Sequence, residues 1–333
     1  MAAFLLRRLA NYAVLVVAAT SLAYLLAAAA LDPRSNFDDR APRPPESVVD
    51  ARLTRLNLND RTSLAVRYGT WAAGVLHGDF GRTWEGRPVN AELWRRLGVS
   101  LRLLSPGAFL GSALGILLGA YAAIRQGRAA DRFITFGSYL LLAVPVFVLA
   151  VLLQIVAAEA NDALGMHLFA WVGETTPGAA YGTFGALGGL ADHVRHLLLP
   201  TVTIATTQVA FYSRYQRGLM LDVLNADFVR TARAKGLRRR TALLRHGLRT
   251  ALIPMTTYFA YSFGFLVLGG MFCEQAFGWH GMGEWLVEAI SRGDVNVVAA
   301  ISCLAACGVL SAGLASDVLH GALDPRVRTG AAA

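Results

Sequence analysis

Nucleotide binding and hydrolysis each need a recognisable set of residues, and this sequence carries neither set. The chain has a single lysine, Lys235, which is followed by Gly236 and Leu237. A phosphate-binding loop of the G-x-x-x-x-G-K-[ST] type needs Ser or Thr directly after its lysine, so this kind of ATP site is not encoded. G-x-S-x-G and H-E-x-x-H segments are also absent from the sequence, which argues against a serine or zinc hydrolase.

The cysteines and histidines do not have the spacing of a metal site. Cys273, Cys303 and Cys307 fall in or beside apolar runs and form neither a C-x-x-C pair nor a disulfide framework. We interpret Cys303 and Cys307, which share a helical face, as small packing residues. His193 and His196 are three residues apart without further ligands close by in the sequence, and we interpret them as surface residues. We therefore expect no metal and no cofactor on this chain.

The composition indicates a membrane protein. Of the 333 residues, 55% are hydrophobic and 16% are charged, and the mean hydropathy is +0.46, which does not suit a water-exposed surface. A bilayer core about 30 Å thick is crossed by roughly 20 apolar residues in a helix. We predict an all-α, polytopic protein with six transmembrane helices, because six stretches near that length lack Asp, Glu, Lys and Arg. They are residues 10–31, 103–124, 133–158, 197–213, 251–273 and 295–316.

Basic residues predict the orientation of these spans. With the N-terminus in the cytoplasm, the cytoplasmic segments carry 17 basic and five acidic residues, as the positive-inside rule requires. An even number of spans then places both termini in the cytoplasm, and we expect a bacterial cell (inner) membrane location. A cleaved signal peptide is the alternative for the first span, because Arg7 and Arg8 precede its apolar run. That run is longer than the apolar core of about 7 to 15 residues found in signal peptides, so we predict a retained helix.

The predicted units are the N-terminus with the first span (1–31), an external cap (32–98), a membrane core (99–320) and a cytoplasmic tail (321–333). In the cap, Pro45 is expected to lead into a short helix from about Glu46. Trp71 and Trp84 are expected to pack inside an ordered cap. Trp94 either packs with them or rests at the depth of the lipid headgroups.

Four glycines in the second span repeat every fourth residue, at positions Gly107, Gly111, Gly115 and Gly119. At 3.6 residues per turn they lie along one face of a helix and leave it without side chains. Such a face allows a second helix to come close, so we predict that it packs against protein.

Uncharged polar residues occupy the spans, and none of the spans has an ionisable residue at its centre. An internal proton relay is therefore not expected, and another energy source is implied. The polar side chains either form hydrogen bonds between helices or line a path for a solute. The candidates for the path are Gln154, Thr207, Gln208, Tyr258, Tyr261 and Ser262.

The longest cytoplasmic segment, residues 214–250, contains the pattern of a short helix. The side chain of Asn225 or Asp227 is suited to cap its start, and Gly236 is suited to the left-handed position at its end. A helix of about nine residues is too short to be stable alone in water, so it needs a surface to dock on. Phe228, Val229 and Ala232 are predicted to form its apolar face.

Three interpretations of this segment compete. Its basic residues anchor the topology and bind anionic lipid, or they bind nucleic acid, or the helix docks on a cytoplasmic protein. Anchoring in the membrane argues against nucleic acid. We favour the docking helix, with Arg230, Arg233 and Lys235 available to acidic partners, because an electrostatic anchor does not need a helix that ends at a glycine.

The segment also resembles a known family. DFVRTARAKGL (227–237) followed by LLRHGLRTALIP (243–254) is similar to the cytoplasmic coupling motif of ABC importer permeases, in the spacing of the B-type subunit of the dipeptide and oligopeptide branch. Further matches follow in order: RRL at 7–9, HGDFGRTW at 77–84, VPVF at 144–147, LLLPTVTIA at 197–205, FGWHGMG at 277–283 and ALDPRVR at 322–328.

The resemblance implies a type I ABC importer permease fold. It implies that a coupling helix inserts into a cleft on an ATP-binding subunit, and that Glu274 and His280 lie near an external mouth. The coupling residues carried over are Asp227, Phe228, Arg230, Ala232, Arg233, Ala234, Lys235 and Gly236.

The implied partners are a second permease subunit (a C-type paralogue), two ATP-binding subunits or one fused ATPase pair, an external substrate-binding protein and membrane lipid. ATP and Mg would bind to the partners, and this chain would not be an enzyme. The alternatives are an ATP-independent facilitator or channel, an ABC permease for another solute such as nickel, and an intramembrane enzyme.

Overall fold

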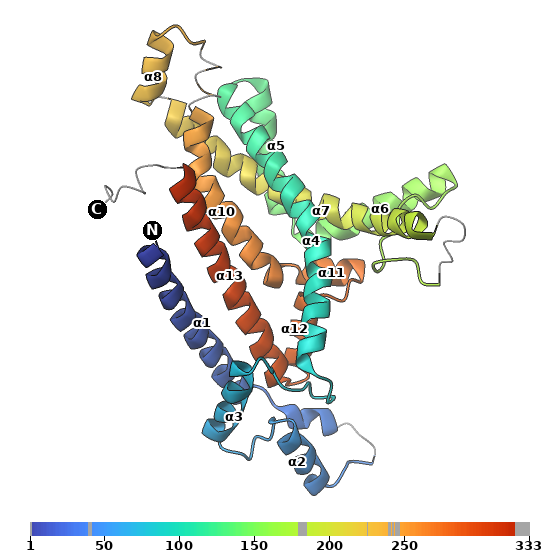
Figure 1. Cartoon of the computed structure of the whole chain (residues 1–333). Helices are drawn as coiled ribbons and strands as arrows, with labels where there is room; N and C mark the ends of the chain where they lie inside the picture. Colours follow the sequence, from blue (N-terminus) through green and yellow to red (C-terminus); the bar gives the residue numbers. More distant parts are fainter. Residues whose placement is uncertain are drawn as a thin grey trace. The chain divides into compact units, whose positions relative to one another are not determined.

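The computed structural model is almost entirely helical, which confirms the all-α prediction (Figure 1). It describes residues 2–38, 42–178, 185–224, 226–238, 241, 243 and 247–323. Within these ranges the extended backbone pairs at one isolated antiparallel bridge, between Arg82 and Pro88.

The helices follow one another along the described chain with short connections. They are α1 (Ala2–Ala30), the 3-10 helix η1 (Pro33–Phe37), α2 (Glu46–Arg55), α3 (Leu64–Leu76), α4 (Val89–Ile124), α5 (Ala129–Ala143), α6 (Val146–Leu164), α7 (Gly185–Leu224), α8 (Asp227–Ala234), α10 (Leu248–Gly269), α11 (Met271–Phe277), α12 (Met282–Ser291) and α13 (Val295–Leu323).

Four helices in the described part of the chain are long and apolar enough to cross a membrane. They cover Leu6–Ala30, Val89–Ile124, Val146–Leu164 and Val295–Val318. The predicted span 197–213 lies inside α7, and most of the predicted span 251–273 lies in α10.

The third predicted span, 133–158, is not one helix. It is divided between α5 and α6, which leave the break in different directions (Figure 1). Val144 at the break is extended, with φ −90° and ψ 119°. Pro145 is the cause, because a proline lacks the N–H for a helical hydrogen bond and disfavours helical backbone at the residue before it.

The chain folds into two compact units, which are described separately. Unit 1 comprises Met1–Leu101, Gly264–Met271 and His280–Leu314, and unit 2 comprises Arg102–Phe263, Phe272–Trp279 and Ala315–Ala333.

In unit 1, the segment 32–98 is an ordered cap with its own apolar core. Trp71 of α3 is 6% exposed and stacks on Tyr24 of α1, with 4.5 Å between ring centroids. Val49 and Leu53 of α2 belong to the same buried cluster, against which Trp84 packs. Trp94 is 61% exposed and stands outside this core.

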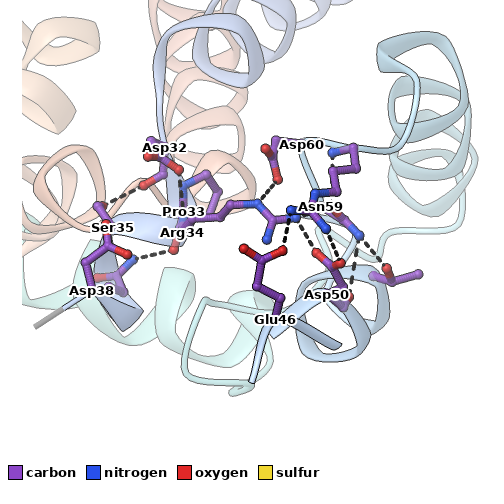
Figure 2. A network of polar contacts seen from close by, with 12 residues as sticks. Asp32, Pro33, Arg34, Ser35, Asp38, Glu46, Asp50, Asn59 and Asp60 are labelled. Atoms are coloured by element: carbon purple, nitrogen blue, oxygen red, sulfur yellow. Dashed lines mark hydrogen bonds and ion pairs between the residues drawn. The ribbon is translucent and has the colours of Figure 1, made fainter. Parts of the chain in front are cut away.

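A polar network ties η1 to α2 at the surface of the cap (Figure 2). Arg34 forms ion pairs with Asp50 and Asp60, and Arg61 pairs with Asp50 at 2.6 Å and with Glu46 at 2.8 Å. The hydrogen bond from Arg34 lowers the pKa of Asp50. The cap is therefore a folded element rather than a spacer between two spans.

Candidate coupling helix and solute path

Helix α8 ends at a glycine in the left-handed conformation. Gly236 has φ +89°, its N–H donates to the carbonyl of Arg233 at 2.9 Å, and the N–H of Leu237 donates to the carbonyl of Ala232 at 3.3 Å. These two bonds form a Schellman motif, which satisfies the last carbonyls of a helix. The local sequence thus determines where α8 stops.

The start of α8 differs from the prediction. The N-cap residue is Ala226, without a side-chain cap, and Asp227 is the first helical residue. The prediction that Asp227 caps the helix is therefore wrong, and Asn225 lies outside the described residues. Asp227 instead pairs with Arg230 at 3.3 Å, and a carboxylate in the first turn interacts favourably with the helix dipole.

One face of α8 is anchored to the rest of unit 2. Val229 and Ala232 are buried against Leu243, and Ile124, Val223, Leu224 and Leu237 pack on this cluster. Phe228, predicted to share the apolar face with Val229 and Ala232, is 44% exposed. Position 228 lies one turn before Ala232, so helical spacing alone does not exclude Phe228; the contacts of Val229 and Ala232 with Leu243 leave it outside the buried cluster.

The other face of α8 is open to a partner. It presents the exposed residues Phe228, Arg230, Arg233, Ala234 and Lys235. An exposed aromatic ring and three cations distributed around one short helix, with Arg230 paired to Asp227, are suited to a cleft that has apolar and acidic contacts. The opposite face of α8 packs on the ends of α4 and α7.

The glycine face of α4 packs directly against α7 within unit 2. A Cβ atom added to Gly107 would lie 2.6 Å from the Cβ of Ile204, and one added to Gly111 would lie 2.6 Å from the carbonyl oxygen of Ala205. Gly115 and Gly119 meet the next turns of α7 equally closely. The four glycines thus allow the two backbones to approach each other.

Three of the six residues suggested for the solute path have side chains engaged in hydrogen bonds within unit 2. Gln154 donates to the carbonyl of Ala276 at 2.7 Å, and Thr207 donates to the carbonyl of Thr203 at 3.2 Å. Ser262 accepts a hydrogen bond from Tyr212 at 2.9 Å. The bonds of Gln154 and Ser262 join different helices, as the first interpretation expects, whereas that of Thr207 stays within α7.

An aromatic cluster between α7 and α10 was not anticipated. The ring of Tyr258 lies 4.9 Å from that of Phe211 and 5.1 Å from that of Tyr215, centroid to centroid. Tyr258 and Tyr261 are each 37% exposed. The spacing of Gln208, Phe211 and Tyr215 on one helical face was the available signal.

The two residues assigned to the external mouth lie in different units. In unit 2, Glu274 is 1% exposed, so its side chain is not part of that unit's surface. In unit 1, His280 has an exposed side chain whose Nδ1 lies 2.9 Å from an oxygen of Glu284. Within the described residues, groups of three or more metal-ligating side chains do not occur.

These features define a polytopic, all-α membrane protein with a short helix, α8, that lies between α7 and α10 in the chain and is packed on the rest of unit 2. A family model described as "Binding-protein-dependent transport system inner membrane component" matches residues 115–329, a range that includes α8. The chain belongs to this family.

Relatives match nearly the whole chain. The oligopeptide transport system permease protein OppB of Mycobacterium tuberculosis is 52% identical over 328 residues, 98% of this chain and 99% of the relative. The oligopeptide transport system permease protein AppB of Bacillus subtilis is 32% identical over 98% of this chain and 99% of its own. The dipeptide transport system permease protein DppB of Escherichia coli is 31% identical over 265 residues, which are 77% of this chain and 78% of the relative. The resemblance to the peptide branch is thereby confirmed.

Proposed function

We propose that this chain is the transmembrane permease subunit of an ATP-driven importer of oligopeptides or dipeptides. It forms half of the translocation pathway in a bacterial inner membrane, with both termini in the cytoplasm. The near full-length match to oligopeptide permeases supports the solute class. The single observation that carries the coupling role is the outward face of α8, which combines Phe228 with three cations on an anchored helix.

The geometry of α8 supports a lever mechanism. Its exposed face docks in a cleft of an ATP-binding subunit, which holds the ATP and Mg. When two such subunits close, the force passes through Val229 and Ala232 into the cluster with Val223 and Ile124, at the ends of α7 and α4. Well-packed contacts pass on a displacement because a close-packed interior has low compressibility.

The other partners complete the transporter. A second permease subunit, a C-type paralogue, supplies the other half of the pathway, and an external substrate-binding protein delivers the peptide. The two ATP-binding subunits are separate chains or one fused pair. Hydrolysis belongs to those partners, so this chain is not an enzyme.

Exchanging the exposed residues of α8 tests the proposal. The double variant combines Phe228→Ala and Arg233→Ala and is expressed with its partner subunits. We expect at least about tenfold less ATP-binding subunit to copurify with it, and we expect peptide uptake to be lost. Arg238→Ala is the matched control, because Arg238 is an exposed cation beyond Gly236. Wild-type recovery of the ATP-binding subunit with the double variant would contradict the coupling role, and ATP-independent uptake would favour a facilitator.

A second pair of variants tests the end of the helix. Nothing lies within 4 Å of a Cβ atom added to Gly236, so a substitution there acts through the backbone angle rather than through bulk. Gly236→Val should weaken the end of α8 by about 1–2 kcal/mol and reduce uptake, whereas Gly236→Asn should be tolerated better. Equal uptake by the two variants would contradict this account.

A further inference from the structure

The described arginines at the surface of the cap fall into two groups. Arg34, Arg43, Arg61, Arg87, Arg95 and Arg96 each form an ion pair with a carboxylate. Three other arginines at the surface, Arg52, Arg55 and Arg82, have no carboxylate within ion-pair distance among the residues that the structure describes. Their charges are therefore available to a partner.

These three arginines line the same groove. The groove runs between α2 and the turn at 82–86, has a volume of about 950 Å³, and is lined by Ser47, Val48, Ala51, Arg52, Arg55, Leu56, Arg82, Glu85 and Gly86. We name it the arginine groove. Its volume is at the upper end of the range of about 300–1,000 Å³ typical of ligand pockets, so it has room for a chain segment as well as for a single ion.

Helical periodicity separates the groove from the ion-pair network of the cap. Val48, Arg52 and Arg55 are four and three residues apart and form one stripe on α2, whereas Glu46 and Asp50 lie on another face of the helix, toward Arg34 (Figure 2). The carboxylates of that network therefore face away from the stripe.

Two of the arginines are held in place by neutral groups. Arg52 donates to the carbonyl of Trp84 at 3.5 Å and lies over the ring of Phe37 at 5.7 Å, and Arg82 donates to the carbonyl of Gly86 at 3.0 Å. The one acidic residue in the lining, Glu85, already pairs with Arg87. The groove therefore keeps its positive charge and is partly pre-organised, which lowers the entropy cost of binding.

We propose that the arginine groove binds a carboxylate-bearing segment of the external substrate-binding protein. This inference rests on the proposed function, in which such a protein delivers the peptide. Guanidinium groups form paired hydrogen bonds with carboxylates. Val48, which is 56% exposed, adds an apolar contact that suits a protein side chain. Positive charge on one partner and negative charge on the other speed association and set the register of docking.

The test compares two triple variants with the same change in net charge. The full-length permease is placed in nanodiscs of phosphatidylcholine, and its affinity for the substrate-binding protein of the same transporter is measured at low and high salt. One variant combines Arg52→Gln, Arg55→Gln and Arg82→Gln. The matched control combines Arg43→Gln, Arg61→Gln and Arg95→Gln, which are surface arginines of the same cap whose carboxylate partners lie outside the groove.

We expect the groove variant to raise the dissociation constant at least about tenfold and to flatten its salt dependence, and the control to change it less than about threefold. Equal weakening by both variants, or unchanged binding by the groove variant, would overturn the proposal. A groove-dependent effect that appears only when phosphatidylglycerol is added would assign the groove to lipid headgroups and overturn it too.

A parallel measurement separates this inference from the proposed function. Recovery of the ATP-binding subunit, which depends on α8, is measured with the same samples. One outcome is that the wild type and both variants all recover the ATP-binding subunit and yet bind the substrate-binding protein with equal affinity. In that case only the groove inference fails. If the wild type recovers no ATP-binding subunit, the proposed function fails.

Discussion

Arg217 near the end of α7 holds Asp131 in the first turn of α5 with two hydrogen bonds. Nε donates to Oδ1 at 2.6 Å and Nη2 donates to Oδ2 at 3.0 Å. The N–H of Gly127 adds a third bond to the carboxylate at 2.9 Å. The bonds from Arg217 lower the pKa of Asp131 to about 2 although partial burial opposes this. The pair thereby joins the start of α5 to α7 shortly before α8.

Asp131→Asn should destabilise the protein because it leaves the Arg217 guanidinium without its carboxylate. We expect a loss of about 2–4 kcal/mol of unfolding free energy, measured by thermal or denaturant unfolding of the purified protein in detergent. Asp222→Asn is the control, since Asp222 is an exposed carboxylate farther along α7. Equal stability of the two variants would show that the pair contributes little.

The same pair predicts a dependence on acid. The folded-state pKa of Asp131 is about 2, below the ordinary value of 3.8 for an aspartate. Its stabilising contribution is therefore complete above about pH 4 and is lost as the pH falls through about 2. Asp131→Asn should remove this part of the acid sensitivity.

The packing of α4 on α7 predicts opposite effects for two glycine substitutions. In Gly111→Ala the new Cβ would lie 2.6 Å from the backbone of α7, whereas Gly218 on α7 has nothing within 4 Å. We expect Gly111→Ala to cost about 1–3 kcal/mol through overpacking. Gly218→Ala should be neutral or stabilise by up to about 1 kcal/mol, because alanine has the higher helix propensity. Unfolding midpoints measured side by side check both, and a stabilising Gly111→Ala would show that the two helices can separate at no cost.

Asp294 predicts a second pH effect, in the opposite direction. Its carboxylate is 1% exposed and accepts the N–H of Trp84 at 2.7 Å and that of Val297 at 3.3 Å. Burial raises its pKa to about 6, and the backbone hydrogen bonds only partly oppose this. Between about pH 4 and pH 6 the folded protein holds a proton that the unfolded chain has released, so stability falls as the pH rises through this window.

Measuring unfolding free energy from pH 4 to pH 7 checks this effect. We expect Asp294→Asn to remove a decrease on the order of 2 kcal/mol between pH 4 and pH 6, because asparagine does not titrate. Its single carbonyl oxygen can accept only one of the two backbone N–H groups, which bond different oxygens of the carboxylate, so the variant is also less stable at every pH. Asp79→Asn, at an exposed turn of the cap, should keep the wild-type slope. A wild-type slope that persists in Asp294→Asn would assign the effect to another group.

The features of α8 that the sequence predicts are those with local causes. A helix stop at Gly236 depends on the freedom of glycine to adopt positive φ, and helix propensity decides the turns before it. The place of Phe228 is different, because the buried face of α8 is selected by Leu243 and Ile124, which the chain brings from elsewhere. A short helix with apolar residues on several sides leaves that choice open in the sequence.

Long-range pairs were equally beyond prediction. Arg217 and Asp131 are 86 positions apart, so their sequence spacing does not indicate a pair. From the sequence, a basic residue at the end of a span is explained by membrane orientation alone. The sequence also left open which arginines of the cap are neutralised. That depends on which side chains the folding of α2 brings beside the turn at 82–86.

The sequence by itself determined the membrane environment, the helical class, the glycine face and the end of the docking helix, because hydropathy, periodicity and glycine backbone freedom act over a few residues. The tertiary structure alone decided that Phe228 faces outward and that three arginines share an unneutralised groove. These outcomes are set by contacts between distant segments, whose energies are not determined by local sequence.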